Sequence, residues 1–325
     1  MGNQGQRKKR QETAVSIRYN SCMNDAGSTN ITQTVLPTLI YIQTHLDGDL
    51  SLEAVARRAM ASPFHFHRLF QTAVGETLKK YTQRLRLERA AFELKIREAP
   101  ILDVALSAGY RSHETFSRAF RRHFGLTPRS YRQAVGRLLQ ADLHDVQMGQ
   151  RMTLNRLTNE YQISAVRVQK LAALPVAFIR SLGPYETVDT TIFDELLAWV
   201  KRRGVFTGDN LLLGIGHDDP SITPAEKLRF DACIQLPGPL AADDKVGFQE
   251  SPAGWFATVT YVGPYGPVMA EAYGAIFQQV LQLRNYRLVG LPAVEIYRTT
   301  RIAADADLNE TDIYLPVEKI GATVS

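Results

Sequence analysis

The chain of 325 residues contains two cysteines, Cys22 and Cys233. Two thiols cannot build a disulfide framework or a four-ligand zinc site, which excludes the small disulfide-rich and zinc-stabilised classes. No apolar run approaches the ~20 residues that a helix needs to cross a bilayer. The first 30 residues carry a basic cluster with no apolar segment behind it, so we expect no secretory signal, no membrane partner and a cytoplasmic location.

The sequence also lacks the short motifs of common catalytic sites. There is no HExxH, no GxSxG, no Walker loop and no CxxC. Gly214-Ile215-Gly216 has neither the third glycine nor the following helix of a dinucleotide site. We therefore predict no catalytic residue, no metal and no cofactor.

The net charge of +5 is distributed unevenly along the chain. Residues 34–136 hold 16 Lys and Arg against 9 Asp and Glu, whereas residues 151–325 hold 16 against 20. A basic segment beside an acidic one favours a polyanion-binding domain joined to a domain with another task.

An internal repeat with an offset of 50 residues lies in the basic segment. It consists of the pairs Ser62/Ser112, Phe66/Phe116, Arg68/Arg118, Phe70/Phe120, Gly75/Gly125, Thr77/Thr127 and Tyr81/Tyr131. Such a duplication indicates two copies of one supersecondary unit. Each copy reads as helix, tight turn and helix, with Ser62 and Ser112 as N-caps of the second helices. Long helices are predicted between the copies, over 81–98, and before them, over 34–46.

The two second helices have the features of DNA-reading helices. A helix-turn-helix unit places its second helix in the major groove, where polar side chains near its start reach the bases. The exposed polar positions are His65, His67, Arg68, Gln71, His113, Glu114, Ser117, Arg118 and Arg121. Arginine can bond guanine bidentately. Successive grooves on one face of DNA lie ~34 Å apart, so one chain with a rigid helix between its copies can read both.

Other residues of the repeat are assigned to phosphate contacts or to the core. The predicted phosphate contacts are Lys79, Lys80, Arg84, Arg122 and Arg129. The phenylalanines at the repeated positions, Phe66, Phe70, Phe116 and Phe120, are predicted to be buried. A metal on His65 and His67 is disfavoured, because an i,i+2 pair points to different sides of a helix.

A second repeat, with an offset of 80 residues, lies in the acidic segment. Leu182-Gly183-Pro184-Tyr185 returns as Val262-Gly263-Pro264-Tyr265. Each copy reads as strand, helix, strand, strand, and two such copies pair into one α+β domain with a pseudo-twofold axis. The predicted strands are 176–181, 211–216, 230–236, 256–261, 289–297 and 312–317, and the predicted helices are 188–202 and 268–283.

An acid among aromatic residues is the predicted ligand site of this domain. Glu295 lies in a strand-like run, at the 80-residue offset from Ile215. A carboxylate at the floor of an aromatic pocket favours a cationic or hydrogen-bond-donating lipophilic ligand. The alternative is that Glu295 lies on the solvent face of its strand. The predicted ligand-binding residues are Glu295, Tyr185, Trp255, Tyr265, Tyr297 and Tyr314.

The segments 52–70 (LEAVARRAMASPFHFHRLF) and 101–131 (ILDVALSAGYRSHETFSRAFRRHFGLTPRSY) resemble the DNA-binding domain of AraC-type transcriptional regulators. The resemblance implies seven helices, two of them recognition helices. By position it places Phe64, His67 and Arg68 of the first copy on base-facing slots, and likewise His113, Glu114, Ser117 and Arg118 of the second copy. Met60-Ala61 stands where the family has a glycine-containing turn.

Residues 163–320 resemble the GyrI-like (gyrase-inhibitor-like) effector domain, an SHS2-type fold. The matching pieces include the two Gly-Pro-Tyr motifs, 229–233 (RFDAC), 292–297 and 311–316 (TDIYLP). The resemblance implies a small-molecule cleft between the repeats, with Glu295 as its acid. Asp312 stands where the family usually has Glu. A DNA-binding domain followed by this domain resembles the arrangement of Rob-type activators.

The sequence thus predicts a multidomain regulator with an all-α tandem helix-turn-helix domain and an α+β domain. The expected segments are a disordered tail (1–33), the DNA-binding domain (34–136), a linker (137–160) and a small-molecule-binding domain (161–325). The expected partners are double-stranded DNA, a small-molecule effector and RNA polymerase, on the nucleoid. Two alternatives stay open: a constitutive regulator with a protein-interaction domain, and a hydrolase, which the missing motifs disfavour.

Overall fold

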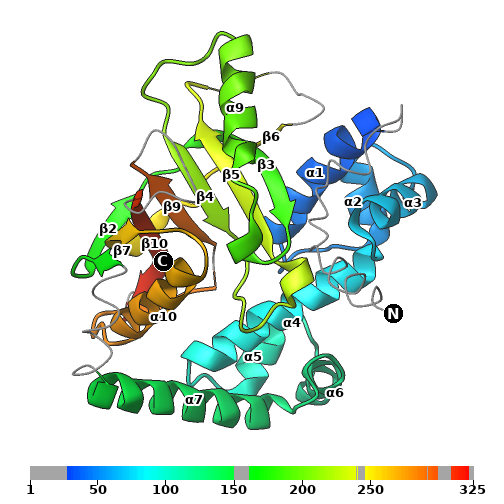
Figure 1. The fold of residues 1–325 in the computed structure, drawn as a ribbon. Helices are drawn as coiled ribbons and strands as arrows, with labels where there is room; N and C mark the ends of the chain where they lie inside the picture. The colour runs from blue at the N-terminus through cyan, green and yellow to red at the C-terminus, as the bar shows by residue number, and fades with distance from the viewer. Residues whose placement is uncertain are drawn as a thin grey trace, which may run out of the picture.

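The computed structural model describes residues 28–149, 161–238, 240, 246–290, 292–298 and 309–321. Most of the predicted tail, residues 1–27, lies outside these residues. The described part of the first domain consists of seven helices (Figure 1): α1 (Ser28–Thr44), α2 (Leu52–Arg58), α3 (Pro63–Val74), α4 (Leu78–Ile96), α5 (Ile101–Ser107), α6 (His113–Phe124) and α7 (Pro128–Gly149). Helix α7 continues through 137–149, a segment that the sequence assigned to a linker.

Serine and glycine residues set the ends of the two second helices. The Ser62 and Ser112 hydroxyls each accept a hydrogen bond from the backbone N–H three residues on, at 3.3 Å. Gly75 and Gly125 end α3 and α6, each with a φ of 75°. An L-residue with a Cβ is disfavoured in this left-handed conformation, which is why glycine recurs there. These local signals confirm the predicted repeat.

The first turn keeps the geometry of the second although it has no glycine. Met60 adopts a φ of 51° and Gly109 a φ of 78°. The residues that follow them, Ala61 and Tyr110, each donate a 3.0 Å backbone hydrogen bond to the preceding helix. The substitution therefore leaves the turn intact, at the cost of a non-glycine residue in a left-handed conformation.

Helix α4 takes part in both helix-turn-helix cores. Its first half contributes Tyr81 and Leu85 to the core around Phe66 and Phe70. Its second half contributes Ala91 and other residues to the core around Phe116 and Phe120. All four predicted core phenylalanines are fully buried. The spacer helix is therefore a shared structural element of both units.

The described strands of the second domain form one ten-stranded sheet in the order β1-β7-β10-β9-β4-β5-β3-β6, with β2 on β7 and β8 on β10. The strands are β1 (Gln162–Ile163), β2 (Arg167–Leu171), β3 (Pro175–Leu182), β4 (Leu212–Gly216), β5 (Arg229–Gln235), β6 (Gly247–Glu250), β7 (Gly254–Gly263), β8 (Tyr286–Leu288), β9 (Ala293–Tyr297) and β10 (Asn309–Lys319). The listed pairs are all antiparallel. Helices α9 (Thr191–Arg202) and α10 (Pro267–Leu281) cover one face (Figure 1).

The two predicted repeats meet where β4 pairs with β9. In this register Gly214 lies opposite Glu295 and Ile215 lies opposite Val294. Ile215 and Val294 share a core with the N-terminal helix α1, whereas the Glu295 side chain is bonded to α10 on the other face. Glu295 therefore shares its sheet face with Gly214 and not with Ile215. Equating Glu295 with Ile215 was wrong, because the two copies differ by one residue before these strands.

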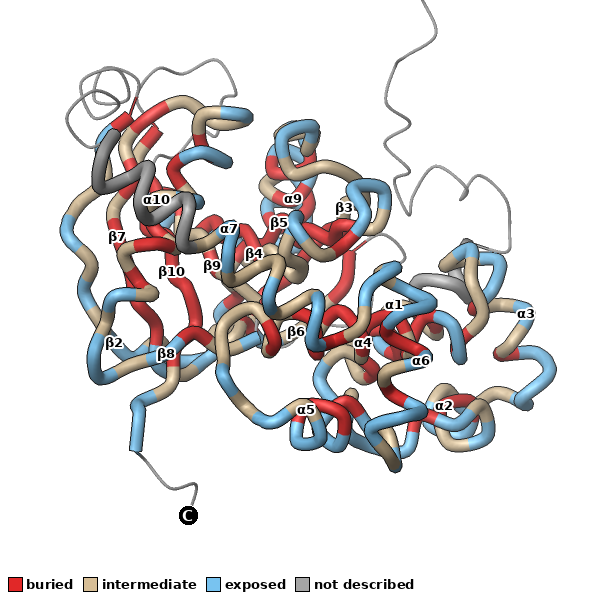
Figure 2. The backbone as a smooth tube through the Cα atoms, turned by 90° about the horizontal axis from the view of Figure 1, so that it is seen from below, coloured by how far each residue is buried: buried red, intermediate tan, exposed pale blue. Residues whose placement is uncertain are grey.

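The other face of the sheet is covered by the DNA-binding domain. Leu36 and Ile40 of α1 pack on the core that contains Phe178 and Phe256. On the far side of α4, Ile222 from the β4–β5 connection packs on the second helix-turn-helix core. Buried backbone runs without a break through the sheet and into α4 (Figure 2). The two domains are thus joined by direct contacts as well as by the chain.

Candidate nucleic-acid interface and ligand site

Both recognition helices keep their predicted base-facing side away from the protein core. Along α3 and α6 the exposed predicted residues are Phe64, Arg68, Gln71, His113, Glu114, Arg118 and Arg121, while His67 and Ser117 are half-buried. Phe64 is 73% exposed, which is unusual for a large apolar side chain. The structure therefore presents the nine predicted DNA-binding residues as two equivalent surfaces.

Contacts within each surface orient individual side chains. The Arg68 guanidinium lies 5.9 Å from the centroid of the Phe64 ring, within reach of a cation–π attraction. On α6, hydrogen bonds from its own backbone N–H and from the Ser112 hydroxyl lower the pKa of Glu114. Glu114 is therefore ionised and able to accept from a base amino group or to hold an arginine.

The predicted phosphate contacts divide into two groups. Lys79, Lys80, Arg122 and Arg129 are exposed near the starts or ends of the helices. Arg84 is not available for a phosphate, and this prediction was wrong. Its guanidinium is buried between Glu76, at 2.7 Å, and Glu88, at 3.2 Å. The helical spacing placed Arg84 correctly on α4 but could not show that the other domain covers it.

Glu295 of β9 is held by two tyrosines. Tyr273 of α10 donates a hydrogen bond to one carboxylate oxygen at 2.7 Å, and Tyr297 donates to the other at 2.6 Å. Burial raises the pKa of Glu295. Burial and the neighbouring carboxylate raise the pKa values of both tyrosines well above 10, so both hydroxyls stay protonated and donate. Glu295 therefore faces the helices and not the open solvent face of its strand.

Three of the predicted aromatic residues gather beside Glu295. The Tyr265 ring lies 5.8 Å from the Tyr297 ring in an edge-to-face arrangement. Tyr185 and Tyr265 both pack on the α9-side core that includes Tyr297. Gly214 lies beneath them, where a Cβ would be 2.5 Å from the Tyr297 hydroxyl oxygen. The absence of a side chain at Gly214 is what lets Tyr297 lie flat against the sheet.

Two predicted ligand residues lie elsewhere. Tyr314 belongs to the core on the α1 face, because strand alternation turns it away from Ile313 and the α10 face. Trp255 begins β7 and contacts Tyr286 of β8, at the other end of the sheet. In their place the structure adds Tyr273, which lies one to two helical turns after the second Gly-Pro-Tyr motif.

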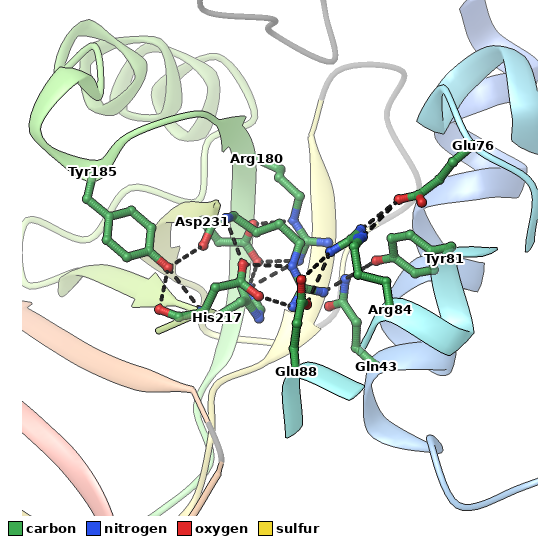
Figure 3. Close-up of polar contacts among 11 residues, drawn as sticks. Gln43, Glu76, Tyr81, Arg84, Glu88, Arg180, Tyr185, His217 and Asp231 are labelled. Carbon is green, nitrogen blue, oxygen red and sulfur yellow. Dashed lines mark hydrogen bonds and ion pairs between the residues drawn. The ribbon is translucent and has the colours of Figure 1, made fainter. Parts of the chain in front are cut away.

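A buried cluster of charges lies between the domains, and sequence reasoning did not find it (Figure 3). Asp231 of β5 accepts from Arg180 Nε at 2.6 Å, from His217 Nε2 at 2.7 Å and from Gln249 Nε2 at 2.8 Å. Beside it, Asp218 accepts from the Arg229 guanidinium, with Nε at 2.9 Å. Arg229 and Asp231 belong to the RFDAC motif, which was the available signal.

The electrostatics of this cluster fix its protonation state. Despite the cost of burial, the Arg180 guanidinium and His217 hold the pKa of Asp231 well below its usual range. Burial lowers the pKa of His217, so it is neutral at neutral pH and donates through Nε2. The Gln43 amide oxygen, oriented toward the domain interface, accepts from Arg180 Nη1 and Arg229 Nη1 at 2.8 Å each. The cluster thus reaches from β5 into α1.

The second repeat carries an open counterpart of this cluster. Asp312 of β10 accepts from the Thr260 hydroxyl at 2.7 Å and from Arg298 Nε at 2.8 Å. Asp312 follows Asp231 by 81 residues, the offset that relates Glu295 to Gly214. The Arg298 side chain is 51% exposed, whereas that of Arg180 is 1% exposed. The DNA-binding domain therefore covers one of two related sites.

Two general properties bear on the class of protein. Within the described ranges, no group of three or more His, Cys, Asp or Glu side chains is arranged to hold a metal ion. No helix in the described part of the chain combines the length and apolarity needed to cross a membrane. The described features of both domains therefore point toward binding of DNA and of a small molecule.

Comparison with known proteins matches each domain separately. Residues 55–134 match a helix-turn-helix domain family, and residues 164–318 match the GyrI-like small molecule binding domain family. The regulatory protein SoxS of Salmonella typhimurium is 43% identical over 104 residues, which cover 32% of this chain and 97% of SoxS. The right origin-binding protein of Escherichia coli strain K12 is 40% identical over 96 residues, 30% of this chain and 33% of that protein.

A solved structure is similar to the second half of the chain. The EcmrR C-terminal domain aligns with 49% of this chain and 99% of its own, at 21% identity and a TM-score of 0.38. Together, the tandem helix-turn-helix units and the attached small-molecule-binding domain define a DNA-binding transcription regulator. The chain belongs to the AraC family of these regulators and carries a C-terminal GyrI-like domain.

Proposed function

We propose that the chain controls transcription by placing α3 and α6 in two successive major grooves, under the control of a small amphipathic or cationic ligand. The observation that carries the proposal is the equivalent exposure of both recognition surfaces while the second domain packs on other sides of the helices. One protomer can therefore bind a full site without dimerisation.

In the proposed complex Arg68 and Arg118 read the bases. Both are exposed at the same slot of the repeat, and arginine pairs bidentately with guanine O6 and N7. The exposed Phe64 ring suits a thymine methyl group. Gln71, His67, His113, Glu114, Ser117 and Arg121 supply the remaining polar contacts, and Lys79, Lys80, Arg122 and Arg129 neutralise phosphates.

In the proposed ligand site Glu295 supplies charge and the tyrosines supply aromatic surface. The carboxylate is bonded to Tyr273 and Tyr297, with Tyr185 and Tyr265 beside them. Aromatic faces attract cations, and a carboxylate among them adds a charge at short range. We place the regulator on the nucleoid in the cytoplasm and assign it the role of an activator that contacts RNA polymerase. Transcription from a bound promoter in vitro tests this role.

Base reading is tested by measuring binding to DNA sites selected with the wild-type protein. Arg68→Ala and Arg118→Ala should each weaken specific binding by about 5- to 150-fold, the equivalent of about 1–3 kcal/mol for a bidentate base contact. Arg202→Ala, on the exposed end of α9, removes the same charge and should change binding little. Unchanged binding in both recognition variants would rule out the assigned helices.

Ligand binding is tested by thermal shift with tetraphenylphosphonium, a lipophilic cation. We expect stabilisation of the wild type that is lost in Glu295→Gln and kept in Glu250→Gln, which alters an exposed carboxylate on β6. Equal stabilisation of all three proteins refutes the assigned site. No stabilisation of the wild type favours the constitutive regulator with a protein-interaction domain. Hydrolysis of p-nitrophenyl acetate that disappears in Glu295→Gln favours the hydrolase.

A further inference from the structure

Helix α4 contacts the second domain at both of its ends. Near its start, Tyr81 accepts a 3.3 Å hydrogen bond from Arg229 Nη1. Near its end, Lys95 donates to Asp219 at 2.7 Å and to the Ser221 hydroxyl at 3.0 Å. These two residues are 14 positions apart, roughly 21 Å along an α-helix. Each contact lies beside a different helix-turn-helix core.

The contact at Tyr81 leads back to one side of the Glu295 site. The Tyr185 hydroxyl donates to the Asp218 carbonyl oxygen and accepts from the Asp218 N–H, both at 3.0 Å. The Asp218 carboxylate in turn clamps Arg229, the partner of Tyr81. The Asp218 and Arg229 side chains are 3% and 8% exposed, so water cannot easily replace these bonds.

The contact at Lys95 leads to the other side of the same site. Tyr273 of α10 is bonded to Glu295 at 2.7 Å. One turn further along α10, the Phe277 ring lies 4.7 Å from the Lys95 ammonium. Residues four apart lie on the same face of a helix, so a displacement of Tyr273 carries Phe277 with it. Lys95 thereby contacts both α10 and the β4–β5 connection.

We propose that α4 is the output helix of the ligand site. A ligand seated between Tyr185 and Tyr273 shifts the two sides of the site relative to each other and so acts on the two ends of α4 unequally. Because α4 is built into both helix-turn-helix cores, the shift changes the placement of α3 relative to α6, and with it the affinity for a two-groove site. By thermodynamic linkage, bound DNA changes ligand affinity by the same factor. The regulatory reading rests on the proposed ligand function, whereas the mechanical connection does not.

The connection is tested by hydrogen–deuterium exchange on the full chain without ligand or DNA. Tyr185→Phe removes the hydroxyl bonded to Asp218 and should speed exchange in peptides from 217–229 and 78–88 by about 2- to 12-fold, the range of one hydrogen bond. Tyr265→Phe is the matched control, because its hydroxyl contacts Thr311 of β10 instead. Equal exchange of 78–88 in the two variants overturns the proposal.

A second variant tests the other contact point. Lys95→Met removes the bonds to Asp219 and Ser221 while keeping an unbranched side chain, and should speed exchange in 89–96 and in α10 but not in 78–84. Unchanged exchange in α10 overturns this half of the proposal. If wild-type protein fails to bind tetraphenylphosphonium while both exchange results hold, the ligand function fails and the connection stands.

Discussion

Glu88 makes the stability of this protein depend on pH near neutrality. It lies on α4 at the domain boundary, with a side chain that is 7% exposed. Burial raises its pKa to about 7; Asp218 adds to the rise, and Arg84 and Arg229 oppose it. The ordinary value for a glutamate is 4.5. In the window between these values the folded chain holds a proton that the unfolded chain releases.

The sign and size of the effect follow from this difference. A raised pKa means that the contribution of Glu88 to stability is full below the unfolded pKa and is lost as the pH rises through the folded pKa. Each pKa unit is worth about 1.4 kcal/mol, so raising the pH from about 5 to about 7.5 should lower the free energy of unfolding by about 2 kcal/mol through this one group.

Urea unfolding at both pH values, in the wild type and in Glu88→Gln, isolates the effect. The difference in the pH dependence between the two proteins should be about 2 kcal/mol, with the wild type losing more stability toward pH 7.5. Glu93→Gln is the control, because Glu93 forms an i,i+4 pair with Arg97 on the same helix. The same pH dependence in the wild type and in Glu88→Gln would refute the assignment of this pKa.

Three further predictions concern single sites. Met60→Gly should raise the free energy of unfolding by about 0.5–1 kcal/mol, since it relieves a left-handed conformation; no gain in the urea midpoint contradicts this. Gly214→Ala should cost about 1–3 kcal/mol and abolish the thermal shift by tetraphenylphosphonium, because its Cβ collides with Tyr297; Gly274→Ala, with open space around it, should do neither. Asp231→Asn should cost about 3–5 kcal/mol by leaving Arg180 buried without its partner, whereas Asp312→Asn should cost far less; equal losses would contradict the role of burial.

Local signals were sufficient to predict the helix-turn-helix units. N-capping serines, C-capping glycines and apolar residues at helical spacing act within a few residues of the chain, so their effect can be read without the fold. The duplication at 50 residues identified the recognition surfaces, and both are exposed in the structure. The strand–helix–strand–strand order of the second domain was predicted for the same reason.

The sequence did not determine which residues meet across the fold. Arg84 has the charge and spacing of a phosphate contact, but packing of the second domain buries it against Glu76 and Glu88. Tyr314 alternates onto the face opposite Glu295, because a shift of one residue in a strand reverses the face of every side chain.

The domain interface was decided by tertiary structure alone. A buried pair such as Arg180 and Asp231 is 51 residues apart in sequence, and the bond from Arg229 to Tyr81 spans 148. Contacts at such separations depend on how the sheet and the helices dock, which no local pattern encodes. The sequence by itself therefore determined that this protein binds DNA through a duplicated unit. Only the docking of the two domains decided that α4 joins that unit to the Glu295 site.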